Sequence, residues 1–200
     1  MSETGVVKFS FEQIAADLAL FAELEELNAC RRKLLQLRMI GVDASGIGYG
    51  NLSVRAEDTT EFYITGSGTG GLPQLSVNDY AKVTKYDVGR NWLQCAGRVV
   101  ASSESFTHAA LYESEPHARA VIHCHDHALW GQLLERGLAT SPDVEYGTPE
   151  MAFEVQRLLG HSAARQQQIF AMAGHADGIV AFGADIEEAF ASLMRHRLGS

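Results

Sequence analysis

The sequence predicts an α/β domain in which a central sheet is covered by helices. Short runs of β-branched and aromatic residues alternate along the whole chain with longer segments of helical periodicity, a pattern typical of this class. The chain has 200 residues, of which 46% are hydrophobic and 20% charged, enough to bury one sizeable core. We therefore expect residues 1–200 to form a single domain, with a loose N-terminus over residues 1–9.

The first helical segment is expected between Phe11 and Met39, where apolar residues recur every three or four positions. Ser10 and Gln13 have the spacing of a capping box at its start, so the pattern predicts one long or broken helix. The glycine-rich stretch of residues 41–50 predicts a loop. Four further helices are expected at residues 102–114, 128–136, 149–159 and 185–197.

Strands are expected where short apolar or aromatic runs are bounded by turn residues. These runs lie at residues 51–55, 61–65, 82–88, 92–95, 120–125, 168–172 and 178–182. The richest glycine run of the chain, residues 66–71, follows the second of them, and a turn at Gly174-His175 separates the last two. Both features interrupt strands at points where a sheet can present loops to a ligand.

The charge and the cysteines restrict the possible partners and the compartment. A net charge of −9 argues against nucleic acid and anionic membranes as partners. The start of the chain lacks a signal-peptide pattern, and no run of 18 apolar residues predicts a membrane span. The three cysteines are odd in number and have no paired spacing, which indicates a reducing setting. We therefore expect a cytoplasmic protein.

The strand expected at residues 120–125 ends in His123 and His125. Side chains alternate along a strand, so both imidazoles point to the same face, and imidazole suits zinc and similar divalent ions. His175 could supply a third ligand, because it lies in the turn between two apolar strands, where open α/β sheets bind ligands. A single histidine is more often solvated or hydrogen-bonded, and this alternative is stronger for the remaining candidates, His108, His127 and His161.

Glu104 is the carboxylate with the best position for chemistry near such a metal. It lies in the first turn of an expected helix, where a carboxylate can simply cap the backbone or can serve as a fourth ligand or general acid/base. Three segments could bind an anion through backbone N–H groups or hydroxyls: Gly50-Asn51, the glycine loop at 65–71, and Ser102-Ser103 at the helix start. The glycine loop lacks the lysine of a Walker motif, so a nucleotide-binding loop is not predicted.

Taken in order, these segments resemble the motifs of the class II aldolase/adducin family, which includes L-fuculose-phosphate aldolase and L-ribulose-phosphate 4-epimerase. The resemblance covers about residues 10–195, nearly the whole chain. It implies a three-layer αβα fold with a central mixed, largely antiparallel sheet. The matching segments are Gly50 to Arg55, Ile64 to Gly68, Ser102 to Glu104 with His108, Ala118 to His125, Tyr146 to Thr148, and Gly174-His175.

The resemblance also implies roles for individual residues. His123, His125 and His175 would bind a divalent metal, most often zinc in this family, and Glu104 would approach the metal and act as acid/base. The residues that would hold a substrate phosphate are Gly50, Asn51, Ser67, Gly68, Ser102 and Ser103. A homotetramer with active sites at subunit boundaries is implied as well.

The implied reaction is aldol or retro-aldol cleavage of a small sugar phosphate, or a related hydroxy-carbonyl compound, through a metal-bound enediolate. Aldolases of the family carry a proton-donating tyrosine in a longer segment before the Tyr-Gly-Thr motif, whereas residues 126–145 contain no tyrosine here. A dehydratase, epimerase or decarboxylase that uses the same metal site therefore remains open. A non-catalytic, adducin-like interaction module and a metal-stabilised structural protein are the alternatives from other classes.

Overall fold

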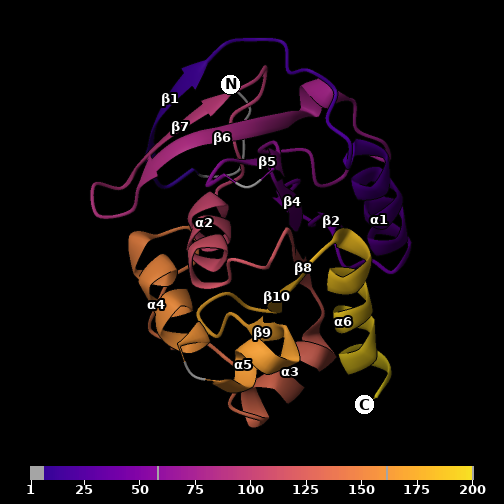
Figure 1. Cartoon of the computed structure of the whole chain (residues 1–200). Helices are drawn as coiled ribbons and strands as arrows, with labels where there is room; N and C mark the ends of the chain where they lie inside the picture. Colours follow the sequence, from indigo (N-terminus) through magenta and orange to yellow (C-terminus); the bar gives the residue numbers. More distant parts are fainter. Residues whose placement is uncertain (1–6, 58, 161, 200) are drawn as a thin grey trace.

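The computed structural model describes residues 7–57, 59–160 and 162–199 (Figure 1). The strands are β1 (Ser10–Ile14), β2 (Gly41–Val42), β3 (Gly48–Tyr49), β4 (Asn51–Arg55), β5 (Phe62–Thr65), β6 (Tyr80–Asp87), β7 (Trp92–Ala96), β8 (Ala120–His125), β9 (Ile169–Ala171) and β10 (Gly178–Gly183). The helices are α1 (Leu24–Gln36), α2 (Ser105–Ser114), α3 (His127–Glu135), α4 (Pro149–Leu159), α5 (Ser162–Gln167) and α6 (Ile186–Leu198), with a 3-10 turn at Val77–Asp79.

The described strands form one eight-stranded sheet of order β1-β7-β6-β5-β4-β8-β10-β9, beside a small β2-β3 ribbon. Every pair of neighbours in the large sheet is antiparallel except β1 and β7. Figure 1 shows α1 and α6 on one side of strands β8 and β10, and α2 and α4 on the other. The predicted three-layer fold with a mixed, largely antiparallel sheet is therefore confirmed.

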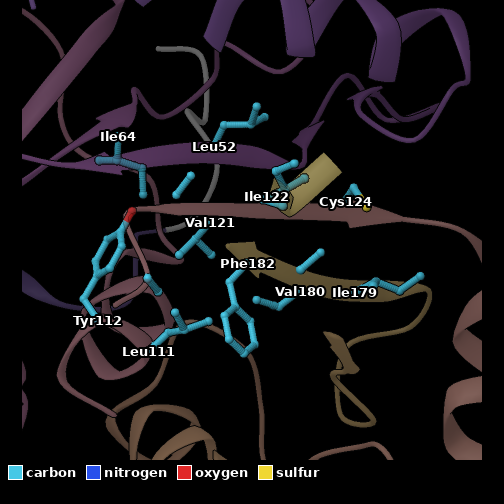
Figure 2. Close-up of a cluster of buried hydrophobic side chains, with 14 of the residues drawn as sticks. Leu52, Ile64, Leu111, Tyr112, Val121, Ile122, Cys124, Ile179, Val180 and Phe182 are labelled. Carbon is cyan, nitrogen blue, oxygen red and sulfur yellow. The ribbon is translucent and has the colours of Figure 1, made fainter. Parts of the chain in front are cut away.

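The alternation of side chains along β8 explains how the sheet contributes to two packed layers (Figure 2). Val121 points toward Leu111 and Tyr112 of α2, whereas Ile122 and Cys124 point to the opposite face. Val121, Ile122 and Cys124 are fully buried, and burial of each aliphatic side chain contributes roughly 1.5–3 kcal/mol. The same period of two places His123 on the face of Val121, at the end of a strand that the core holds rigidly.

The predicted helix from Phe11 to Met39 is wrong in its first half. Residues Ser10–Ile14 form β1, which pairs in parallel with β7, and α1 begins only at Leu24. Ser10 Oγ donates to Asn91 O (2.8 Å) and Gln13 Nε2 donates to Gly97 O (2.9 Å), so these side chains do not form a capping box. The spacing of apolar residues cannot reveal this pairing, because β1 is held by backbone hydrogen bonds to the edge of β7, which do not depend on the side chains.

Three smaller differences from the sequence-based expectations concern the connecting segments. Of the expected loose N-terminus, residues 1–6 lie outside the described residues, whereas Phe9 is buried with its ring centroid 5.2 Å from that of Phe106. The expected loop at 41–50 contains the β2-β3 ribbon, and α5 was not predicted. None of the described helices combines the length and the apolar composition needed to cross a membrane.

Candidate metal and anion site

Strand β8 carries His123 and His125 to the end of the sheet, as predicted. Across the ladders, Asn51 of β4 lies opposite His123 on one side, and Val180 of β10 lies opposite it on the other. His175 comes from the turn between β9 and β10, where its N–H donates to Met172 O (3.0 Å). A Cβ on the preceding Gly174 would lie 1.9 Å from the oxygen of Val144, so only glycine fits this approach of two backbones.

The three histidines form one cluster. One ring nitrogen from each of His123, His125 and His175 can be chosen so that all three lie within 4.8 Å of one another. The ring centroids are 4.7–5.2 Å apart. The Nδ1–H of His123 donates to the carbonyl oxygen of Ile179 (3.1 Å), which leaves the Nε2 lone pair available as a ligand.

The electrostatics of the cluster favour neutral imidazoles, the form that binds metals. Burial holds the pKa of His123 well below its usual value, and the neighbouring histidines add to this effect. Burial also lowers the pKa of His125, and lowers that of His175 to about 3. His125 Nε2 and His175 Nδ1 are buried and have no hydrogen-bond partner within the described part of the chain. These residues therefore fit a divalent metal ion, which would accept the lone pairs of both nitrogens.

Glu104 lies beside this cluster. Its side chain makes no capping hydrogen bond at the start of α2, so simple capping does not account for its position. Oε2 accepts from Thr107 Oγ1 (3.0 Å), whereas Oε1 is buried without a partner, 3.7 Å from His175 Nδ1. Burial raises the pKa of Glu104 to about 7, against the lowering effects of the Thr107 hydrogen bond and the Lys8 charge. Such a carboxyl can hold or release a proton near neutral pH.

The segments considered for anion binding line the same cavity as the histidines and Glu104. This cavity has a volume of about 210 Å³. Asn51 Oδ1 is buried there without a partner, and Gly68 has a φ of +79° with open space around it. A bridge between Gly66 and Ala101 brings the glycine run beside the serines that precede α2. The candidate anion-binding residues at the cavity wall are Gly50, Asn51, Ser67, Gly68, Ser102 and Ser103.

Arg31 supports the glycine run and was missed in the sequence. Its buried guanidinium donates from Nη2 to Thr69 O (2.9 Å) and from Nη1 to Leu72 O (3.1 Å). These bonds fix the carbonyl oxygens of Thr69 and Leu72 at the end of the run. Gly66, Ser67 and Thr69 donate their own N–H groups to other backbone oxygens, so the N–H of Gly68 is the candidate contact for an anion. The available signal was an arginine on the apolar face of a helix, between Leu27 and Leu34.

Two tyrosines also line the cavity, although neither was given a role from the sequence. The ring centroid of Tyr146 lies 4.1 Å from that of His175, with an interplanar angle of 22°. The ring centroid of Tyr49, in the β2-β3 ribbon, lies 5.1 Å from that of His125. Both side chains therefore lie close enough to the histidines to contact a substrate.

Two of the weaker histidine candidates, His108 and His127, lie outside this cavity. His108 Nδ1 pairs with Ser53 Oγ (2.6 Å) in the core beneath it. His127 Nδ1 pairs with Asp177 Oδ1 (2.7 Å) at an adjacent, more open depression. His161 lies outside the described residues. The alternative of an ordinary hydrogen-bonded histidine therefore holds for the first two.

Comparisons with known proteins identify the family of this α/β domain. The model of the class II aldolase and adducin N-terminal domain matches residues 38–196, so the chain belongs to the class II aldolase and adducin family. A comparison with curated protein sequences gives no match.

Three solved structures illustrate the structural similarity. An L-fuculose 1-phosphate aldolase has a TM-score of 0.68 and 20% identity over 90% of this chain and 84% of that chain. YgbL from Klebsiella pneumoniae, whose description leaves open aldolase, epimerase or decarboxylase, has a TM-score of 0.64 and 22% identity, covering 87% and 86%. L-fuculose-1-phosphate aldolase from Thermus thermophilus has a TM-score of 0.57 and 21% identity, covering 88% and 86%. At these identities, the similarity shows the fold alone.

Proposed function

We propose that this protein is a metal-dependent lyase that cleaves a small sugar phosphate, or a related hydroxy-carbonyl compound, by retro-aldol chemistry. The observation that carries the proposal is the convergence of His123, His125 and His175 with the unpartnered Oε1 of Glu104. These groups share one cavity with the candidate anion-binding residues. An open site with three imidazoles, one carboxyl and an adjoining polar cavity suits catalysis better than a closed structural metal site does.

In this mechanism, three neutral imidazoles and Glu104 would hold a divalent ion, which we propose to be zinc. Such an ion supplies a Lewis acid that stabilises negative charge on the substrate oxygens next to the cleaved bond. Asn51 and the N–H of Gly68 would bind the phosphate and orient the substrate. Glu104 would move the proton through Oε1, which is buried beside His175 without a hydrogen-bond partner.

Aldol cleavage also requires an acid at the departing carbonyl oxygen. Residues 126–145 contain no tyrosine, but Tyr49 and Tyr146 line the cavity and each carries a hydroxyl. We propose that one of these two hydroxyls supplies the proton. If neither does, the site is better suited to epimerisation, dehydration or decarboxylation, which begin with the same loss of a proton or a carbon substituent next to a carbonyl.

An activity screen tests this proposal. Purified protein supplied with zinc is incubated with ketose 1-phosphates and with the same ketoses lacking phosphate, and all products are identified. We expect cleavage of a phosphorylated ketose, its loss in His123→Ala and Glu104→Gln, and its retention in the control His117→Ala, which removes an exposed histidine. Asn51→Ala should raise KM for the phosphorylated substrate by about tenfold, the equivalent of one lost charged hydrogen bond.

Different outcomes select different functions. Epimerised, dehydrated or decarboxylated products would replace the lyase assignment while keeping the metal site. Full activity in His123→Ala would contradict the site itself. An inactive protein that binds no metal would favour a non-catalytic interaction module, which needs none of these residues.

The oligomeric state and the cellular compartment of the protein are part of the same proposal. We infer a homotetramer, as the family resemblance implies, and a cytoplasmic setting, as the odd number and unpaired spacing of the cysteines indicate. Cys30, Cys95 and Cys124 are free and buried, which is consistent with a reducing compartment. Sedimentation equilibrium and cell fractionation test the two parts separately.

A further inference from the structure

The segment before β1 reaches the candidate site, although the family match begins only at residue 38. Phe9 anchors this segment in the core against Phe106, two residues after Glu104. The following residues pair with β7 along the edge of the sheet. Lys8 is therefore held at one end of a fixed strand, next to the wall of the cavity.

The ammonium group of Lys8 contacts the segment that carries Tyr146. Nζ donates to Glu145 Oε1 (2.7 Å) and to the backbone oxygen of Tyr146 (3.0 Å). It also lies 3.7 Å from the centroid of the Tyr146 ring, within the range of a strong cation–π contact. The Lys8 side chain is only 19% exposed, so solvent weakens these contacts little.

Tyr146 transmits this contact to a candidate metal ligand. Its ring is stacked on the imidazole of His175, with centroids 4.1 Å apart. Lys8, Tyr146 and His175 thus form a column that ends at the histidine cluster. The Lys8 charge also acts electrostatically on both His175 and Glu104.

We propose that Lys8 is a positioning residue, which holds Tyr146 against His175 and so fixes the orientation of this imidazole for metal binding. The inference rests on the proposed metal site. Groups that orient a ligand imidazole are normally hydrogen-bond acceptors, and their loss weakens metal binding by about 10–100-fold. His175 Nδ1 is the unpartnered nitrogen that would bind the metal, and the stacked Tyr146 ring lies against the face of this imidazole, where it can restrain the orientation of the ring.

The alternative is that Lys8 forms only a surface ion pair with Glu145. The chain contains a matched example of such a contact away from the site. Lys82 Nζ lies 2.5 Å from Glu61 Oε2 and 5.6 Å from the centroid of the Tyr63 ring. Lys82→Met is therefore the control for removal of a lysine that pairs with both a glutamate and a tyrosine ring.

The test measures binding of the metal alone to the full chain. Zn²⁺ affinity is determined by competition with a chromophoric chelator, and the absorption spectrum of bound Co²⁺ reports ligand geometry. We expect Lys8→Met to raise the Zn²⁺ dissociation constant about fivefold and to change the Co²⁺ spectrum. Three control variants should keep the Zn²⁺ dissociation constant within about twofold of the parent. Lys8→Arg keeps the cation, Tyr146→Phe keeps the stacked ring, and Lys82→Met leaves the site unchanged. Tyr146→Leu should weaken binding by about tenfold.

The outcomes separate this inference from the proposed function. A parent protein that binds no Zn²⁺ contradicts the metal site, and the role of Lys8 falls with it. A parent that binds Zn²⁺ together with an unchanged Lys8→Met overturns the role of Lys8 alone. Equal losses in Lys8→Met and Lys82→Met would also overturn it, because they would report a general loss of stability.

Discussion

The buried imidazole of His108 predicts a loss of stability in mild acid. The side chain is fully buried, with Nδ1 2.6 Å from Ser53 Oγ, which in turn lies 2.7 Å from the hydroxyl of Tyr112. Its Nε2 has no partner within the described residues. Burial lowers the pKa of His108 to about 3, so the folded protein keeps this group neutral.

The direction of the change in stability with pH follows from proton binding to His108 in the folded and unfolded states. An unfolded chain protonates His108 below its ordinary pKa of about 6.5, whereas the folded protein does so only near 3. The stabilising contribution is therefore fully present above pH 6.5 and is lost progressively as the pH falls toward 3. Between pH 7.5 and pH 5 the loss is about 2 kcal/mol, a large part of the stability of a typical domain.

Urea unfolding of the metal-free protein at pH 7.5, 6.5 and 5.0 measures this effect. Other histidines also titrate, so the comparison is with His108→Gln, which keeps a hydrogen-bonding group toward Ser53 and removes the titration. The parent should lose about 2 kcal/mol more than the variant over this range. Identical pH dependence of the two proteins would refute the account of His108 as a buried neutral group.

Two further perturbations probe the elements that position the site. Gly174→Ala should lower the free energy of unfolding by about 3 kcal/mol and weaken Zn²⁺ binding, because the added Cβ clashes with Val144 O. The control is Gly131→Ala in α3, where a Cβ meets open space. This variant should raise the free energy of unfolding by about 0.5–1 kcal/mol. Arg31→Met should lower the free energy of unfolding in urea by roughly 3 kcal/mol and weaken binding of inorganic phosphate, because the glycine run loses its charged donor. An unchanged urea midpoint would show that Arg31 does not support the glycine run.

Much of the sheet could be predicted because side-chain patterns determine it directly. Residues Ala120 to His125 form β8 with the predicted boundaries, since an apolar run that ends in polar residues marks both a buried strand and its exit. The two histidines of this strand therefore had a predictable orientation. The position of His175 beside these two histidines was inferred from its place in a glycine-containing turn. The close approach of the Gly174 backbone to that of Val144 explains why glycine occurs there.

The parts that could not be predicted depend on backbone pairing and on long-range contacts. Strand β1 was not predicted, because its apolar residues have helical spacing and the strand is stabilised by hydrogen bonds to β7. Arg31 acts on carbonyl oxygens some forty positions away, and Lys8 acts on a segment that lies 138 positions later in the sequence. Neither contact leaves a local pattern, because a single cation has no sequence period that identifies its partner.

The central claim is that His123, His125 and His175 hold one divalent metal in an open site. A crystal structure of protein loaded with zinc, with anomalous diffraction measured at the zinc absorption edge, tests it most directly. The account predicts one peak per chain, about 2.0–2.1 Å from a ring nitrogen of each histidine, with a coordination position facing the cavity. A peak elsewhere, no peak, or a fixed protein ligand other than Glu104 that closes the site would contradict it.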